Sequence, residues 1–268
     1  MNRRACHKRE IAGQAASLPI GLPVPDRKAA GMPAPADGNP APLWQRHGFS
    51  GTDLLVVLAI VFLLAAVAVP MITRARSKTR LQQCISNLQQ VNRAVLLYAE
   101  DNKGTVPLLQ ASPQPGSWWH YKEKVKGYLG LTGPSSPDEK VFGCPVDRGY
   151  GEGGEKLVPF RTSKKYNYTS YNLNSITLPG VPNIAGWQVS AVKDPSRTLL
   201  TMEWTAHAPL SWHRSRTGKA NAPFYNDAES VVGFVDGHVS LIPVYYDGVN
   251  AAYTRDPIPG YLYKYSGN

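Results

Sequence analysis

One uncharged apolar run, Leu54–Ile72, most constrains what this chain of 268 residues can form. At a rise of about 1.5 Å per residue, a helix over this run spans most of the roughly 30 Å hydrocarbon core of a bilayer. The rest of the sequence contains no second run of this kind. The sequence therefore predicts a single membrane-spanning or membrane-anchoring helix. Pro70 lies inside the run, where a membrane helix tolerates a proline with a kink.

The apolar run continues into an amphipathic pattern that begins at Arg74. Apolar residues recur there every three or four positions, as they do on one face of a helix. Polar residues, Asn87 and Asn92 among them, occupy the other faces. The helix is expected to end near Asp101, before Asn102-Lys103-Gly104, and to pack its stripe on a globular domain. The stripe consists of Leu81, Ile85, Leu88, Val91, Val95 and Tyr98.

The segment before the apolar run, residues 1–47, is rich in Pro, Ala and Gly and has no periodic pattern. Such a composition cannot bury enough apolar surface to fold. It also lacks the continuous apolar stretch of an ordinary signal peptide. We expect a disordered leader, with Met1 or, alternatively, Met32 as its start.

The remainder, residues 105–268, carries short segments that favour β-strands. A tight turn at Asp236-Gly237 joins the last two as a hairpin. Gly151–Gly154 and the Ser211–Asn226 region are expected to be exposed loops. The sequence thus predicts an α+β fold, in which a long N-terminal helix packs on a small antiparallel sheet. The candidate strands are Thr198–Glu203, Ser230–Val235 and His238–Tyr246.

The positive charge of the chain points to lipid rather than to nucleic acid. The net charge is +10, and it falls to +6 when the first 48 residues are left out. A nucleic-acid-binding protein needs a basic face with groove-reading elements, whereas basic residues just beyond an apolar helix typically meet lipid headgroups. The main basic cluster is Arg74, Arg76, Lys78 and Arg80.

Three cysteines are present, and Cys6 lies in the expected leader. Cys84 and Cys144 remain as a pair, and in an oxidising compartment they can form a disulfide. The alternative is two buried free thiols, which behave as small apolar side chains. The sequence does not decide between them, because it does not show whether the two Cα atoms lie within bonding distance.

The residues around the start of the apolar run carry a family resemblance. Gly48-Phe49-Ser50-Gly51-Thr52-Asp53 resembles the processing site of type IV prepilins and type II secretion pseudopilins. The resemblance implies cleavage after Gly48 by prepilin peptidase, N-methylation of Phe49, and a helix that anchors the subunit until it packs into a filament. Asp53 stands where the family usually has Glu, whose carboxylate pairs with the N-terminal amine of a neighbouring subunit. A carboxylate there matters because an unpaired ammonium is costly in hydrocarbon.

Five later motifs, in order, are similar to those of bacterial prepilin-type proteins whose C-terminal domain is named for an H-x9-DG motif. His213 is the natural histidine of that motif here, but 22 residues separate it from Asp236. A loop insertion would explain this spacing, as would loss of the motif's role. The motifs are Cys84-Ile85-Ser86-Asn87-Leu88-Gln89-Gln90, Tyr98-Ala99-Glu100-Asp101-Asn102, Gly143-Cys144-Pro145, Ser170-Tyr171-Asn172-Leu173-Asn174 and Phe234-Val235-Asp236-Gly237-His238-Val239.

The resemblance implies a structural subunit and not an enzyme. Its domains would be a leader (1–48), a membrane and filament-core helix (49–73), an amphipathic helix (74–104) and a periplasmic globular domain (105–268). Its partners would be prepilin peptidase, other pilin-like subunits, an inner-membrane assembly platform and membrane lipid, without nucleic acid. The location would be the bacterial inner membrane, with a single pass. Basic residues after the anchor favour the opposite orientation, with the C-terminal domain in the cytoplasm.

The sequence predicts no catalytic residues and no cofactor. It contains no HExxH, no paired CxxC and no nucleotide-binding glycine pattern after a strand. Two metal alternatives stay open: zinc at His213, Asp236 and His238, and calcium at loop carboxylates. A Ser211, His213 and Asp236 triad lacks a nucleophile-elbow sequence. The calcium candidates are Asp227, Glu229, Asp247 and Asp256.

Two rival functions follow from other residues. The first is a membrane-anchored protein that never polymerises and binds glycan or cargo, for which Trp118-Trp119 would form an exposed contact. The second is an anchored metal-dependent hydrolase, which would need one of the metal sites above.

Overall fold

The computed structural model describes residues 50–109, 118–149, 157–177, 179–206, 210–213, 228–245 and 256–268. By internal contacts the chain divides into residues 1–54 and 55–268. The calcium candidates Asp227 and Asp247 lie outside the described residues, as do the loop Gly151–Gly154 and the processing residues Gly48 and Phe49.

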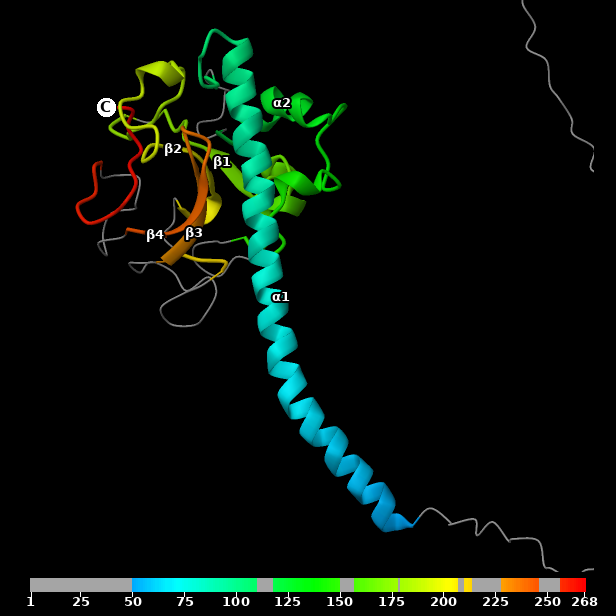
Figure 1. Cartoon of the computed structure of the whole chain (residues 1–268). Helices are drawn as coiled ribbons and strands as arrows, with labels where there is room; N and C mark the ends of the chain where they lie inside the picture. The colour runs from blue at the N-terminus through cyan, green and yellow to red at the C-terminus, as the bar shows by residue number, and fades with distance from the viewer. Residues whose placement is uncertain are drawn as a thin grey trace, which may run out of the picture. The chain divides into compact units, whose positions relative to one another are not determined.

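The two predicted helical segments form one unbroken helix, α1, which runs from Gly51 to Asp101 (Figure 1). Pro70 lies inside it, and the side chain of Thr73 donates a hydrogen bond to the Pro70 carbonyl at 2.9 Å. The predicted end near Asp101 is confirmed. Gly104 takes a left-handed φ of 74° and its N–H donates to the Ala99 carbonyl at 2.7 Å, which closes the last turn.

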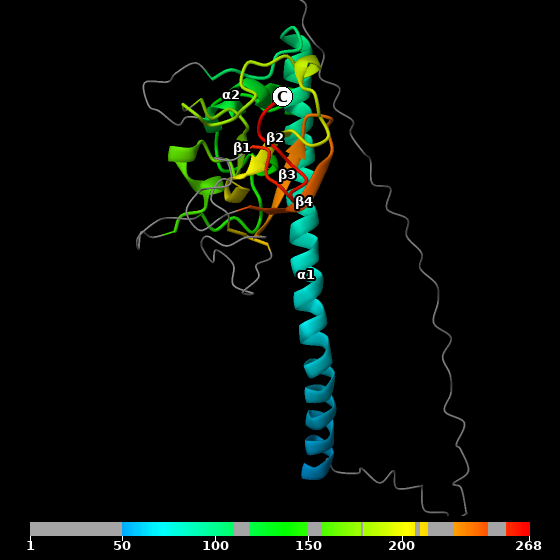
Figure 2. The same cartoon turned by 90° about the vertical axis from the view of Figure 1, so that its left-hand side faces the viewer.

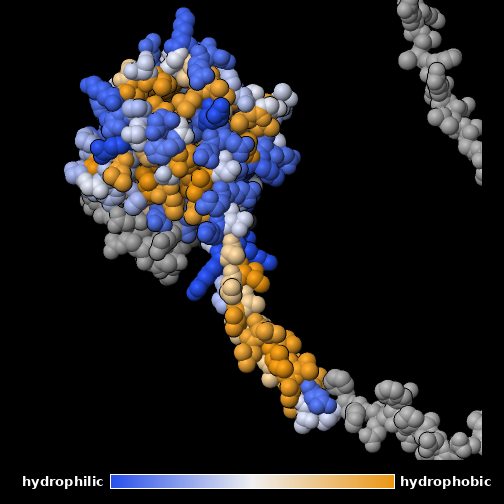
Figure 3. All heavy atoms as spheres, in the orientation of Figure 1, coloured by the Kyte–Doolittle hydropathy of each residue, from blue (hydrophilic) through white to orange (hydrophobic). Residues whose placement is uncertain are grey.

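The environment of α1 changes along its length. Residues 51–80 are all exposed, whereas burial begins at Leu81. Figure 3 shows the exposed part as a continuous run of hydrophobic residues that gives way to hydrophilic ones near the globular part. Among the described residues, α1 is the one helix long and apolar enough to cross a membrane.

The second half of α1 packs on the domain, as the stripe predicts, but two polar residues outside the stripe are buried as well. Leu88, Val91 and Val95 are fully buried, while Asn92 is also fully buried and Asn87 is 9% exposed. Both asparagines make long-range hydrogen bonds that a periodic pattern does not reveal. The apolar stripe therefore marks only part of the buried surface of α1.

Four antiparallel strands form a single sheet in the order β1-β2-β3-β4, which lies beside the second half of α1 (Figure 2). The strands are β1 (Tyr171–Leu173), β2 (Leu199–Glu203), β3 (Ala228–Phe234) and β4 (Val239–Val244). In the hairpin, Val231 pairs with Leu241. The α+β fold and the three predicted strands are confirmed, with ends shifted by one to two residues.

The turn between β3 and β4 lies at Asp236-Gly237, as predicted. Gly237 takes a φ of 98°, which favours glycine, and its N–H donates to the Phe234 carbonyl at 3.0 Å. The register on both sides follows from this turn, because Phe234 N–H in turn donates to the His238 carbonyl at 2.9 Å.

Two parts of the domain differ from expectation. Strand β1 and the short helix α2 (Tyr121–Val125) are additional elements, both too short to show a period in the sequence. The exposed loop expected over Ser211–Asn226 is wrong at its start, because Ser211 and Trp212 are buried. The Trp212 indole N–H donates to the Gly149 carbonyl at 3.2 Å, which holds this segment inside. Residues 214–226 lie outside the described part of the chain.

Helix and sheet meet at a polar contact inside the core. The Asn92 side-chain amide donates to the Phe234 carbonyl at 3.0 Å, and its oxygen accepts the Thr201 hydroxyl at 2.7 Å. Gly233 makes this approach possible, because a Cβ at that position would lie 2.6 Å from the Asn92 oxygen. The contact fixes α1 at one position along strands β2 and β3.

Candidate functional site

At its N-terminal end, α1 is capped by its own first residues. The Asp53 carboxylate accepts the Ser50 backbone N–H at 3.0 Å. Ser50 precedes the helix and Asp53 lies three residues later, so the pair has the form of a capping box, in which the third helical residue reaches back to the cap. Asp53 therefore has a local structural role at the helix start.

The exposed half of α1 leaves large apolar side chains uncovered on every face. Leu54, Phe62 and Leu63 are 54%, 71% and 70% exposed. Covering apolar surface is worth roughly 25 cal/mol per Å², and a helix that is apolar all round needs a non-aqueous environment. Exposed apolar surface of this extent is typical of a membrane-spanning helix or of a helix that packs against other apolar helices.

Basic residues surround a hollow of about 730 Å³ where α1 meets the domain. Arg148, from the loop after Cys144, lines this hollow together with the basic cluster of α1, as do His213 and Glu229. Five cations close to the end of an apolar helix suit an anionic surface such as lipid headgroups. The α1 members are Arg74, Arg76, Lys78 and Arg80.

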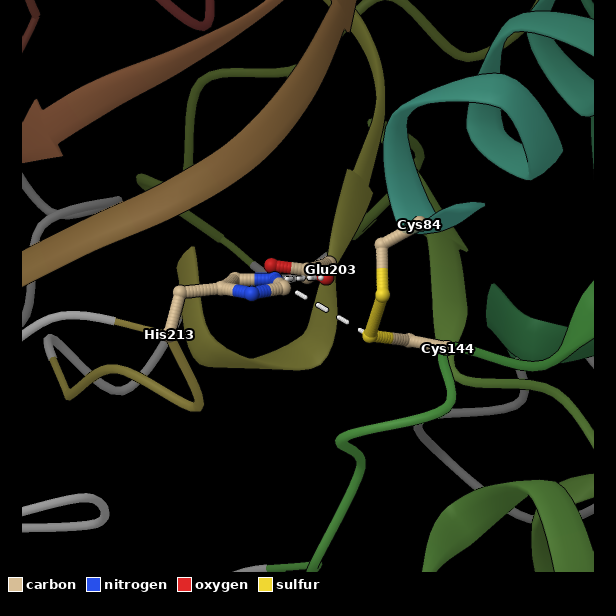
Figure 4. Close-up of side chains that lie close together, drawn as sticks. All are labelled: Cys84, Cys144, Glu203 and His213. Carbon is tan, nitrogen blue, oxygen red and sulfur yellow. Dashed lines mark hydrogen bonds and ion pairs between the residues drawn. A yellow bond between two sulfur atoms is a disulfide. The ribbon is translucent and has the colours of Figure 1, made fainter. Parts of the chain in front are cut away.

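The two cysteines left open by the sequence form a disulfide. Cys84 belongs to α1 and Cys144 to the loop after a short turn of helix, and their Cα atoms are 4.8 Å apart (Figure 4). Both side chains are fully buried. The bond therefore ties α1 to the domain across 60 residues of sequence.

A buried glutamate and a histidine lie against this disulfide. Glu203, the last residue of β2, has no exposed side-chain surface, and His213 has 4%. One Glu203 oxygen lies 2.8 Å from His213 Nε2, and the other accepts the Val231 backbone N–H at 2.9 Å. These two partners offset the cost of burying the carboxylate.

The disulfide and the pair form one cluster. Cys144 Sγ is 3.9 Å from His213 Nε2, and in Figure 4 the histidine ring points toward both Glu203 and the sulfur. Potential ligand atoms of Cys84, Cys144, Glu203 and His213 all lie within 4.8 Å of one another. Cys84 and Cys144 lie in two of the motifs described above, and His213 is the candidate histidine of a third. Sequence reasoning missed Glu203, whose one visible signal is a charge that ends an apolar strand.

A hydrogen-bonded chain supports the cysteine side of the cluster. The Cys144 backbone N–H donates to the Ser170 hydroxyl at 3.0 Å, and that hydroxyl donates to Asp147 at 2.7 Å. Asp147 also accepts the backbone N–H groups of Gly149 at 2.7 Å and Arg161 at 2.9 Å. Burial nevertheless raises the pKa of the Asp147 carboxyl above its usual value, because desolvation outweighs these hydrogen bonds.

The zinc set expected at His213, Asp236 and His238 is not assembled. Asp236 is held in the hairpin turn, where its oxygen accepts the His238 N–H at 3.1 Å and lies 2.6 Å from His238 Nδ1. His213 instead contacts Glu203. Among the described residues, the group of possible metal ligands that contains His213 includes neither Asp236 nor His238.

The other sequence candidates have structural roles. Asp256 accepts the backbone N–H groups of Tyr265 at 2.8 Å and Ser266 at 2.9 Å. Glu229 lies within β3. The Ser211 hydroxyl donates to the Glu229 carbonyl at 2.6 Å, so the Ser211, His213 and Asp236 triad is not formed either.

Trp118 and Trp119 are half-buried and do not form an exposed platform. The centres of their rings lie 6.1 and 5.4 Å from the centre of the Trp204 ring, and the centre of the Trp119 ring is 5.5 Å from that of Tyr166. They belong to an aromatic cluster that also includes Phe160, which stacks on Trp204 at 4.6 Å.

Comparisons with known proteins add no relative. No protein-family model matches the sequence, and no curated protein or solved structure is significantly similar to it. The function has to be inferred from the residues and geometry of this chain.

Proposed function

We propose that this chain is a pilin-like structural subunit that is processed after Gly48 and assembles through its N-terminal helix into a periplasmic filament of a type II secretion-like system. The observation that carries the proposal is α1 itself. It is one continuous helix whose first half is apolar and wholly exposed and whose second half is packed into an α+β domain.

This arrangement suits a subunit that must exist in two surroundings. In the membrane, lipid covers the apolar half of α1; in a filament, the same half of neighbouring copies covers it. Because α1 is unbroken and its second half is fixed to the sheet by Asn92, the position of the apolar half determines where each domain lies. A structural role needs no catalytic group, and we propose none.

The disulfide supports a periplasmic domain. Buried disulfides persist in oxidising compartments, whereas the cytosol keeps thiols reduced. The Cys84–Cys144 bond therefore weighs against the cytoplasmic orientation that the basic residues after the anchor favour. On this proposal the chain crosses the bacterial inner membrane once. Its partners are prepilin peptidase, other pilin-like subunits, the assembly platform and lipid.

The N-terminus of the mature protein tests the processing step. Membranes from cells with and without prepilin peptidase are digested, and the mass of the N-terminal peptide is measured. The expected result is N-methyl-Phe49 only where the peptidase is present, and no such peptide from a Gly48→Leu variant. An intact leader in peptidase-containing cells, or cleavage elsewhere, contradicts the proposal.

The rival function, an anchored glycan- or cargo-binding protein that does not polymerise, has less support. Its expected contact, Trp118-Trp119, is packed against Trp204 instead of standing free on the surface. Crosslinking through the apolar half of α1 separates this rival from a filament subunit, because a singly anchored protein yields only monomers.

A further inference from the structure

The buried cluster of Cys84, Cys144, Glu203 and His213 has the composition of a metal site as well as of a disulfide. Two sulfurs, one imidazole nitrogen and one carboxylate oxygen are ligands that zinc takes in tetrahedral sites. They come from four separate parts of the chain: α1, the loop at Cys144, the end of β2 and the segment at His213. The fold alone brings them together.

The distances leave little to rearrange. Zinc bonds of about 2.0–2.3 Å in a tetrahedron place ligand atoms about 3.3–3.8 Å apart. The four candidate atoms here lie within 4.8 Å of one another, and His213 Nε2 is 3.9 Å from Cys144 Sγ. Opening the sulfur–sulfur bond moves the two sulfurs apart, in the direction that the tetrahedron requires.

The surroundings of the cluster also suit a metal. Glu203 keeps one oxygen on the Val231 N–H, so its other oxygen is fixed toward His213. Ordered second partners of this kind orient ligands and raise affinity. His213 also lines the hollow where α1 meets the domain, so one of the four candidate ligands borders an open cavity.

We propose that the reduced form of this protein binds one zinc ion through Cys84, Cys144, His213 and Glu203. The disulfide and the zinc site are mutually exclusive, because both use the same two sulfurs. The site is therefore a feature of the chain before its cysteines are oxidised, or after a dithiol has reduced them. This proposal does not depend on filament assembly.

The chemistry balances in two steps. A dithiol reductant gives two electrons and two protons to the Cys84–Cys144 bond and becomes a cyclic disulfide itself. Zinc then replaces the two thiol protons, which pass to the buffer, and Glu203 and neutral His213 complete the coordination. A disulfide oxidant takes two electrons from the two thiolates and two protons from the buffer, and it becomes a dithiol. The Cys84–Cys144 bond forms again, two ligands are lost and the ion is released.

Zinc retention by the full chain in detergent tests this proposal. One sample is kept oxidised, and a second is reduced with a phosphine in the absence of oxygen. Both samples are then exposed to zinc and dialysed against a weak chelator. The expected result is about one zinc per reduced chain by elemental mass spectrometry and almost none per oxidised chain. Cobalt in place of zinc should give the sulfur-to-cobalt charge-transfer band and the strong visible absorption of a tetrahedral thiolate site.

Single variants assign the ligands. His213→Ala should weaken zinc binding by more than the roughly 10- to 100-fold that loss of an outer-shell partner costs. Glu203→Gln should also weaken it, while His238→Ala, in the separate pair with Asp236, should leave it unchanged. Circular dichroism shows whether each variant is folded, and the cobalt spectrum of the unaltered chain does not depend on any variant.

Either of two results overturns the proposal. The first is a folded, reduced chain that retains no more zinc than the oxidised chain. The second is bound cobalt without the sulfur charge-transfer band, which would place the ion elsewhere. Neither result would affect the processing experiment at Phe49, so the two proposals fail separately.

Discussion

Lys122 and Glu139 form a buried ion pair in the domain. Lys122 Nζ lies 2.7 Å from Glu139, and the two side chains are 0% and 8% exposed. The same ammonium donates to the Asn167 carbonyl at 2.9 Å and lies 4.8 Å from the centre of the Phe142 ring. Burial lowers the pKa of Lys122, and Glu139 acts against this shift. The charge is therefore tolerated only as part of a complete set of partners.

Glu139→Gln should lower the free energy of unfolding by about 3–5 kcal/mol, because it leaves the Lys122 charge buried without its counter-ion. Urea unfolding followed by tryptophan fluorescence measures the change. Asp138→Asn is the matched control, since Asp138 and Lys140 form an exposed pair at 3.8 Å. That control should change stability by less than about 1 kcal/mol. Equal effects of the two variants would show that the Lys122 pair is not buried as described.

Asp147 gives a prediction about pH. Its pKa is raised above the usual 3.8 by burial, so the folded chain binds the proton more tightly than the unfolded chain. Its contribution to the free energy of unfolding should therefore become more favourable as pH falls through the raised pKa, and level off below the usual value. The free energy of unfolding of the unaltered chain minus that of Asp147→Asn, measured from neutral to acidic pH, should become more positive as the pH falls. A flat or opposite trend contradicts the assignment; Asp138→Asn again serves as the exposed control.

At the scale of elements, Asn92 holds α1 on the sheet through bonds to Phe234 and Thr201. Asn92→Ala should lower the free energy of unfolding by about 2–3 kcal/mol, because it leaves a buried carbonyl and a buried hydroxyl without this partner. Gln90→Ala is the control on the same helix, since Gln90 is exposed and its amide donates to the Ser86 carbonyl four residues earlier. Urea unfolding of both variants checks the prediction, and a loss at Asn92 no larger than that at Gln90 would contradict it.

The elements that the sequence predicts are those with a local cause. The stripe at Leu88, Val91 and Val95 shows the face of α1, and Asp236-Gly237 shows the hairpin, because both depend on near neighbours in sequence. Strand β1 has three residues and no period to detect.

The cluster could be predicted only in part, because it depends on contacts between residues that are far apart in the sequence. Cys84 and Cys144 are visible as a pair, but their bonding depends on a fold that brings residues 60 apart in sequence together. Glu203 and Asn92 appear as ordinary polar residues, because nothing local reveals that a charge or an amide has a buried partner. Long-range contacts of this kind determine the site, and they come from the tertiary fold.

At the scale of the whole molecule, the proposed assembly depends on two parts of α1 that act together. The apolar half supplies the surface that must be covered, and Asp53 supplies a carboxylate near the new N-terminus. Asp53 already accepts the Ser50 N–H, so it caps its own helix with one oxygen. On the filament proposal it also meets the ammonium of a neighbouring subunit, since an unpaired charge among apolar helices is costly.

Crosslinking through the apolar half tests this assembly. With Val57→Cys and Ile60→Cys together in the mature chain and a bis-maleimide, a filament should give a ladder of oligomers in membranes of cells with prepilin peptidase. Each copy then carries two reactive thiols on the exposed half of α1 and can be linked to two neighbouring copies. Asp53→Asn should reduce the ladder severalfold, since each lost charge pair costs at least about 1 kcal/mol, whereas Asp53→Glu should preserve it. The mass of the N-terminal peptide shows whether each variant is still processed, so a failure of cleavage is not mistaken for a failure of packing. A processed chain that yields only monomers would indicate a subunit that is anchored singly. A ladder that is unchanged by Asp53→Asn would indicate a filament that is held together without this charge.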